Sequence, residues 1–307
     1  MNLPKKINII EVGPRDGFQS IEKFIATEIK IEIINRLIDA NLQKIEVTSF
    51  VNPKLVPQMR DAREVFLSVN KKVECLALVP NIKGAELAIE AGVKTITMVI
   101  SASESHNMAN TRHTITASIK EMAAIAKMCS LNGIQLRLDL ATAFGCPYEG
   151  RVDITTVRKI VNAAKELIIR EIILCDTTGM ANPLMVEKTI KKLCIEGDNV
   201  AFGVHFHNTR GTGIANILAA LTCGVQNIET SVGGLGGCPF APGASGNVAT
   251  EDAVNMFNDM GIETGVDLEK LLDCSKYLNG LFHERLSSHI LIAGTTYSKH
   301  TCNNIRR

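Results

Sequence analysis

The chain has 307 residues, with 33 basic and 32 acidic side chains, and 46% of its residues are hydrophobic although tryptophan is absent. This charge balance argues against nucleic-acid binding, and no apolar run is long enough to cross a membrane. A core of Ile, Leu, Val and Ala is typical of parallel sheets covered by helices.

The nine cysteines are scattered along the chain without close pairs. Their odd number and their positions inside helix and strand patterns indicate reduced thiols, as in a cytoplasmic protein. The first residues lead directly into a predicted strand without an apolar signal region. We therefore expect a soluble protein of the cytoplasm.

Apolar runs of strand length alternate with longer helical patterns along most of the chain. We expect strands at residues 7–12, 44–48, 73–79, 95–100, 134–141, 171–175, 200–206 and 227–231. Helical patterns lie between them, and several begin at Thr or Asn-Pro, which favour helix starts: 27–40, 83–91, 114–132, 155–168, 183–195 and 211–223. Eight such units predict a TIM (β/α)8 barrel. The alternative, a doubly wound open sheet, would carry a Gly-x-Gly-x-x-Gly turn after its first strand, and that turn is absent.

The segment after the last strand, residues 233–247, is rich in glycine and is predicted to be a loop. Helical patterns follow at 250–260 and 267–280, and residues 285–307 have the composition of a packed extension or a loose tail. We expect a single domain over residues 1–307. Its barrel covers about 5–232, its glycine-rich loop 233–247, and its additional C-terminal helices 248–307.

A His-x-His pattern in the seventh strand is the first sign of chemistry. Side chains two apart in a strand point to the same side, so His205 and His207 present their imidazoles together. Such a pair is either a metal-binding pair or two hydrogen-bonded neighbours. Supporting ligands elsewhere in the chain decide between these interpretations.

Two oxygen ligands are available near the predicted barrel mouth. Asp16 follows the first strand and Asn247 ends the glycine-rich loop, although each also suits an ordinary turn beside glycine. Active sites of TIM barrels lie at the carboxyl ends of the strands, which favours the ligand interpretation of Asp16. A mixed nitrogen and oxygen site favours Mg²⁺, Mn²⁺ or Zn²⁺ over a closed structural zinc.

Three other charged residues fall in or beside predicted strands. Arg15 is either the ion-pair partner of Asp16 or a holder of an oxyanion. Glu46 would be costly to bury alone, so it is either paired with a cation such as Arg15 or positioned for proton transfer. Arg137 is a candidate partner for Asp139 or Asp176, and Asp176 is equally suited to cap a turn.

Cys238 differs from the other cysteines because it lies in the glycine-rich loop over the predicted site. A thiol there can transfer a proton to carbon or attack a carbonyl. The alternatives are a disulfide or a loop thiol without a role.

These segments resemble 3-hydroxy-3-methylglutaryl-CoA lyases from about residue 5 to about residue 280. The glycine-rich cysteine loop is the most specific of them. The matching segments are Gly13-Pro14-Arg15-Asp16-Gly17, Ile45-Glu46-Val47-Thr48-Ser49-Phe50-Val51, Gly145-Cys146-Pro147-Tyr148-Glu149-Gly150, His205-Phe206-His207 and the run from Ser231 to Asn247.

The resemblance implies a TIM-barrel metallolyase that acts on an acyl-CoA thioester, forms acetyl-CoA and acetoacetate, and works as a homodimer. It assigns a divalent cation, Mg²⁺ or Mn²⁺ rather than Zn²⁺, and no further cofactor. The implied metal ligands are Asp16, His205, His207 and Asn247. The implied catalytic residues are Arg15, Glu46 and Cys238, together with His205 as a candidate base.

The expected mechanism is a retro-Claisen cleavage. The cation holds the substrate hydroxyl, a base removes the hydroxyl proton, Arg15 stabilises the developing oxyanion, and Cys238 delivers a proton to carbon. The base is open among Glu46, His205 and a hydroxide ion at the metal.

Departures from the lyase pattern leave other substrates open. At the positions of residues 18–22, the lyases usually have the sequence Leu-Gln-Asn-Glu-Lys. They have Asp in place of Asn208, and the sequence Arg-Gly-Tyr-Val-Ser in place of residues 137–141. The segment 105–109 also lacks the usual Phe and Lys. The alternatives are a lyase for a related 3-hydroxyacyl-CoA such as citramalyl-CoA, a Claisen-type synthase of the same superfamily, or a non-catalytic metal-binding protein.

Overall fold

The structure is a computed structural model that describes residues 3–194, 199–237, 246–282 and 286–296. Eight parallel strands form a closed barrel in chain order, because β1 pairs with both β2 and β8. The strands are β1 (Asn8–Glu11), β2 (Lys44–Ser49), β3 (Glu74–Val79), β4 (Thr95–Ser101), β5 (Gln135–Ala141), β6 (Glu171–Asp176), β7 (Ala201–Phe206) and β8 (Asn227–Thr230). The predicted TIM barrel and its eight strands are confirmed.

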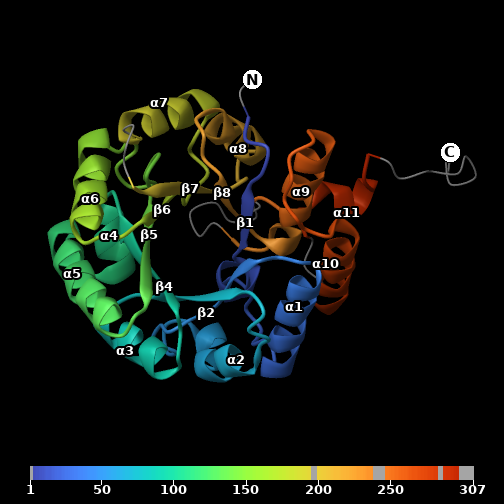
Figure 1. Cartoon of the computed structure of the whole chain (residues 1–307), viewed down its shortest axis with the longest axis horizontal. Helices are drawn as coiled ribbons and strands as arrows, with labels where there is room; N and C mark the ends of the chain where they lie inside the picture. The colour runs from blue at the N-terminus through green and yellow to red at the C-terminus, as the bar shows by residue number, and fades with distance from the viewer. Residues whose placement is uncertain (1–2, 195–198, 238–245, 283–285, 297–307) are drawn as a thin grey trace, which may run out of the picture.

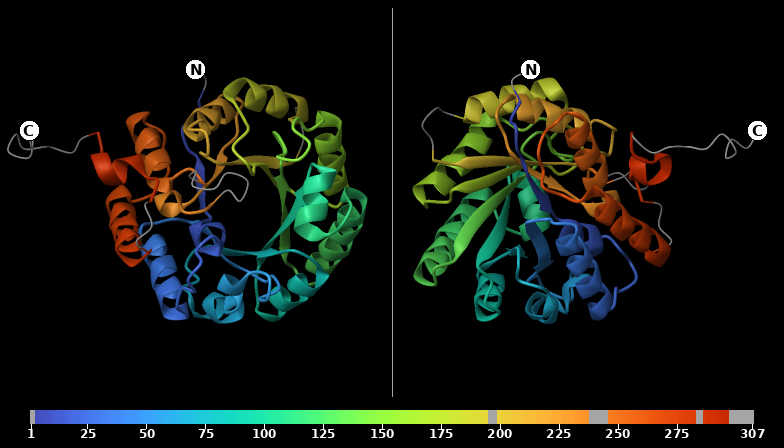
Figure 2. Two further views of the ribbon diagram at one scale, coloured as in Figure 1. Left: turned by 180° about the vertical axis from the view of Figure 1, so that it is seen from behind. Right: turned by 45° about the vertical axis from the view of Figure 1, so that its right-hand side comes forward.

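Helices surround the barrel on all sides (Figures 1 and 2). They are α1 (Thr27–Asp39), α2 (Ala62–Ser68), α3 (Ile82–Glu90), α4 (Glu104–Thr111), α5 (Ile115–Leu131), α6 (Ile154–Glu166), α7 (Pro183–Leu193), α8 (Gly213–Thr222), α9 (Thr250–Asp259), α10 (Leu268–Phe282) and α11 (His289–Ala293). Three short turns complete the described elements: η1 (Gly13–Gly17), η2 (Pro57–Met59) and η3 (Val232–Gly234). Helices α2, α4 and α11 were not expected from the sequence.

Side-chain caps explain several helix starts. Asn182 accepts a hydrogen bond from the Met185 amide, and Pro183 follows it at the first helical position of α7. Thr114 caps α5 in the same way. Helix α4 is short and polar, and Ser103 caps it. A polar helix of two turns carries little apolar periodicity, which is why the sequence pattern did not reveal it.

The C-terminal helices pack on one another, and α10 also packs against α1 (Figure 1). The Tyr277 hydroxyl of α10 donates a hydrogen bond to Glu32 of α1 at 2.7 Å. Of the glycine-rich segment, residues 232–234 form the 3₁₀ turn η3, whereas a loop was expected from residue 233. Residues 238–245 lie outside the described residues.

The barrel has an apolar outer layer and a partly polar interior. Strand residues alternate, so side chains such as Ile45, Leu138 and Val204 face the helices and join the main hydrophobic core. A second, small apolar cluster consists of Ile10, Val12, Ile173 and Cys175. Charged side chains at the interior positions of the same strands are buried, so ionisable groups lie close together inside the barrel.

Gly203 lies on β7, two residues before the first histidine of the pair. A Cβ atom there would lie 2.9 Å from the backbone oxygen of Asn227 and would also collide with Ile173. We expect Gly203→Ala to lower the free energy of unfolding by about 1–3 kcal/mol through overpacking. Urea unfolding measures this loss.

Gly280→Ala is the matched control for that variant. Gly280 lies in α10, and nothing stands within 4 Å of the position that a Cβ would take there. This change should raise the free energy of unfolding by about 0.5–1 kcal/mol, because alanine favours the helix. Equal stability of the two variants would contradict the tight packing at β7.

Candidate metal centre and active site

Three predicted ligands meet at the carboxyl end of the barrel. One ligand atom from each of Asp16, His205 and His207 lies within 4.8 Å of the others. The two imidazole rings are 5.3 Å apart between centroids, and both histidines are buried. The strand alternation expected for β7 therefore places both imidazoles on one side, while Phe206 joins the outer core.

Asp16 is held by the π-helical turn η1, directly after β1. This turn packs closely against β1 and η3. A Cβ at Gly13 would lie 2.7 Å from Glu11 Oε1, and one at Gly17 would lie 2.8 Å from the Leu235 Cβ. Glycine at both ends therefore allows the turn to bring Asp16 next to the histidines.

Asn247 joins the same group from the far side of the glycine-rich segment. Its backbone forms an isolated antiparallel β-bridge with His207. Its side-chain Nδ2 donates hydrogen bonds to Asp16 Oδ2 and to the Leu235 carbonyl oxygen, both at 2.8 Å. Its Oδ1 and the Nδ1 of His207 are buried without a hydrogen-bond partner among the described residues. Buried polar atoms normally have a partner, so a carboxylate, two imidazoles and an unpaired amide oxygen fit a divalent cation.

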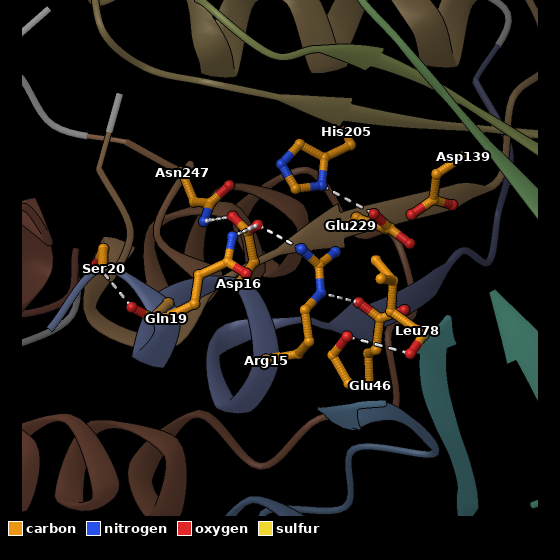
Figure 3. Close-up of polar contacts among 12 residues, drawn as sticks. Arg15, Asp16, Gln19, Ser20, Glu46, Leu78, Asp139, His205, Glu229 and Asn247 are labelled. Carbon is orange, nitrogen blue, oxygen red and sulfur yellow. Dashed lines mark hydrogen bonds and ion pairs between the residues drawn. The ribbon is translucent and has the colours of Figure 1, made fainter. Parts of the chain in front are cut away.

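Arg15 bridges two carboxylates beside this group (Figure 3). Its Nε donates to Glu46 and its Nη1 donates to Asp16. The sequence left Arg15 and Glu46 each with an ion-pair interpretation, and the structure contains both pairs. Glu46 Oε1 has no hydrogen-bond partner among the described residues.

The charges around Asp16 control its protonation. Burial alone would raise the pKa of Asp16, but Arg15 and the two histidines outweigh burial and hold that pKa well below its usual range. Burial and the neighbouring His205 lower the pKa of His207 to about 4. A carboxylate and a neutral imidazole are the forms that bind metal.

Arg137 lies inside the barrel and contacts several carboxylates. Its Nη2 donates to Asp139 Oδ1 at 2.8 Å and to Glu229 Oε1. Asp176, the other partner considered from the sequence, instead accepts hydrogen bonds from the Met180 and Ala181 amides. Asp176 is therefore the cap of the turn that follows β6, which was the second interpretation of that residue.

Glu229 was missed by the sequence analysis. Its Oε2 lies 2.8 Å from His205 Nδ1, and the side chain is fully buried. Burial would raise the pKa of Glu229, but Arg137 and His205 lower it to about 2. The available signal was an acidic residue in an otherwise buried strand, the same signal that drew attention to Glu46.

Cys238 lies outside the described residues, but its flanks are described. A Cβ added at Gly236 would lie 3.6 Å from Asp16 Oδ2, and a Cβ added at Gly246 would collide with the Gly236 carbonyl group. The two ends of the segment therefore meet beside Asp16. Among the described residues, the cysteines at positions 75, 129, 146, 175, 223 and 274 are free thiols.

Within the described residues, none of the helices combines the length and the apolar composition needed to cross a bilayer. The fold and the site together define a TIM barrel whose mouth offers nitrogen and oxygen ligands to a divalent cation.

Comparison with known proteins identifies the family. A family model described as HMGL-like matches residues 6–278. The chain is 43% identical over 293 residues to hydroxymethylglutaryl-CoA lyase of Bacillus subtilis. The aligned residues cover 95% of this chain and 98% of the relative. The chain belongs to the HMGL-like family.

Two further relatives extend the comparison. An HMG-CoA lyase from Acinetobacter baumannii, solved in complex with coenzyme A and 3-methylmalate, has a TM-score of 0.92 and 39% identity, covering 98% of this chain and 99% of that chain. The chain is also 37% identical over 303 residues to (R)-citramalyl-CoA lyase of Chloroflexus aurantiacus, covering 95% of this chain and 96% of the relative.

Proposed function

We propose that this protein is a divalent-metal-dependent carbon–carbon lyase that cleaves 3-hydroxy-3-methylglutaryl-CoA to acetyl-CoA and acetoacetate. The observation that carries the proposal is the meeting of Asp16, His205 and His207 at the barrel mouth. Similarity to hydroxymethylglutaryl-CoA lyase over 95% of the chain supports the substrate. Asn247 completes the proposed ligand set, and Mg²⁺ or Mn²⁺ suits it better than Zn²⁺.

The bound cation would supply Lewis acidity that lowers the pKa of the substrate's tertiary hydroxyl. Asp16, His205, His207 and Asn247 would hold it. Arg15 binds the oxygen on which negative charge develops when the bond between C2 and C3 breaks. Its Nε and Nη1 are engaged by Glu46 and Asp16, so we assign Nη2 to that oxygen.

Two proton transfers complete the reaction. A base takes the hydroxyl proton, so that C3 becomes the ketone of acetoacetate, and the electron pair of the broken bond passes to the thioester as an enolate. Glu46 is the preferred base, because its Oε1 is buried without a partner among the described residues and His205 is a proposed metal ligand. Cys238 then gives a proton to C2 and releases acetyl-CoA.

A related 3-hydroxyacyl-CoA ester, such as citramalyl-CoA, is the second candidate substrate. The similarity to a citramalyl-CoA lyase favours it, as do departures near the site. Asp139 stands where the lyases usually have tyrosine. His106 stands in the segment that departs from their Phe and Lys pattern, and its Nδ1 lies 2.7 Å from the Ser101 hydroxyl. Both side chains are buried.

Mixing the metal-free protein with Mg²⁺ and each ester tests both candidates. We expect acetyl-CoA from 3-hydroxy-3-methylglutaryl-CoA with acetoacetate as the second product, and a lower kcat/KM for citramalyl-CoA. The reverse order of kcat/KM would select the second candidate. Release of acetyl-CoA from neither ester would contradict the proposed activity.

The remaining parts of the proposal come from the sequence patterns and, for the dimer, from the family resemblance. We infer one catalytic domain with a barrel over about 5–232, an active-site loop at 233–247 and a helical extension at 248–307. We further infer a homodimer that works in the cytoplasm. Light scattering coupled to gel filtration tests the dimer.

A further inference from the structure

We infer that Glu229 is a positioning residue that orients His205 toward the cation and is itself held in place by Arg137. The inference rests on the proposed metal site. It assigns a role to residues outside the proposed set of metal ligands.

Strand register brings Glu229 to His205. The two residues are direct partners in the pairing of β7 with β8, so their side chains project from adjacent strands on the same side. Glu229 Oε2 lies 2.8 Å from His205 Nδ1. A carboxylate at Nδ1 favours the tautomer that carries its proton there, which leaves the lone pair of Nε2 free for a metal ion.

Arg137 holds the other oxygen of the Glu229 carboxylate. Its Nη2 donates to Glu229 Oε1, and the arginine is fully buried. Two further carboxylates fix the guanidinium: Asp139 at 2.8 Å, and Glu171 at 3.5 Å on the Nη1 side. Figure 3 shows Glu229 joined to His205 by a hydrogen bond, with Asp139 on the other side of Glu229. These contacts therefore hold the Glu229 carboxylate in one favoured orientation. Through its hydrogen bond, Glu229 in turn favours one orientation of the His205 ring.

Glu171 provides a matched control within the same network. It is a buried glutamate paired with Arg137, as Glu229 is, but its other partner is Lys44 rather than a histidine. Glu171→Gln and Glu229→Gln each remove one negative charge beside the same arginine. Only the second removes the charged partner of His205.

The test is titration of metal-free wild-type protein and both variants with Mn²⁺ by calorimetry. We expect Glu229→Gln to weaken Mn²⁺ binding by about 10-fold to 100-fold, as for other groups that orient metal-binding histidines. Glu171→Gln should bind Mn²⁺ as the wild type does. Mn²⁺ binding by Glu229→Gln that equals that of Glu171→Gln would overturn the inference.

A second measurement separates positioning from a purely structural role. Nitrogen-15 spectra of the metal-free protein at alkaline pH, where the imidazoles are neutral, should show His205 with its proton on Nδ1, and Glu229→Gln should lose this single tautomer. An unchanged His205 signal would count against the inference. Glu171→Gln should leave the signal unchanged, even if it lowers the melting temperature.

Glu229→Asp keeps the test decisive if Glu229→Gln does not fold. Aspartate retains the charge beside Arg137 but is shorter by one methylene, so we expect weaker Mn²⁺ binding in a folded protein. Wild-type affinity in this variant would overturn the inference. Failure of the wild type itself to bind Mn²⁺ would contradict the metal site, whereas binding by the wild type that Glu229 variants leave unchanged would contradict only the positioning role.

Discussion

Cys238→Ala is expected to lower turnover by about two to four powers of ten, the contribution of a positioned general acid. The flanking residues motivate this prediction, because Gly236 lies beside Asp16 and the cysteine follows two residues later. The proposed metal ligands do not include the thiol, so Mn²⁺ affinity should remain that of the wild type. Steady-state assays together with calorimetry measure both quantities.

Cys223→Ala is the control for this variant. Cys223 follows α8, whose last turn lies at the amino-terminal end of the barrel, opposite the site. This substitution should leave kcat unchanged. Full turnover by Cys238→Ala would remove the thiol from the proton transfer and leave the rest of the proposed site intact.

His207→Ala is expected to weaken metal binding and, with it, to lower turnover. Its imidazole is buried, and its Nδ1 has no hydrogen-bond partner among the described residues. The loss of several kcal/mol of Lewis-acid stabilisation corresponds to about two or three powers of ten in rate. Metal analysis after gel filtration and steady-state assays at fixed Mg²⁺ check this prediction.

Two controls accompany His207→Ala. His289→Ala removes an exposed imidazole that pairs with Asp252, and it should retain the metal content and activity of the wild type. Treating the wild type with a chelator should reproduce the loss of activity, and added Mg²⁺ should restore it. A His207→Ala protein with wild-type metal content would contradict the proposed ligand set.

The fold followed from local patterns because parallel strands and their helices carry their own signals. Each strand appears as a short apolar run, and Asn182 with Pro183 marks a helix start. Helix α4 was not predicted from the sequence because its residues, Glu104–Thr111, are mostly polar. The 3₁₀ turn η3 was not predicted either. Gly233 and Gly234 adopt positive φ angles there, and a glycine-rich sequence allows such angles but does not require them.

Local sequence patterns were enough to establish the order of βα units and the chemical types at the strand ends. His205 and His207 share a side because alternation along a strand is local. Their positions near the predicted barrel mouth made Asp16 and Asn247 candidate companions, and the family resemblance implied the same two residues. The sequence offered ion pairs of Arg15 with Asp16 and with Glu46 only as alternatives. The folded chain contains both pairs, because they depend on how η1 packs against β2.

Barrel closure and strand register settled the remaining contacts. Register placed Glu229 beside His205, and the barrel interior paired Arg137 with Asp139 rather than Asp176. Alternation says which residues of a strand face inward. It does not say how far one strand is displaced along the next, and a displacement of one residue would turn Glu229 away from His205.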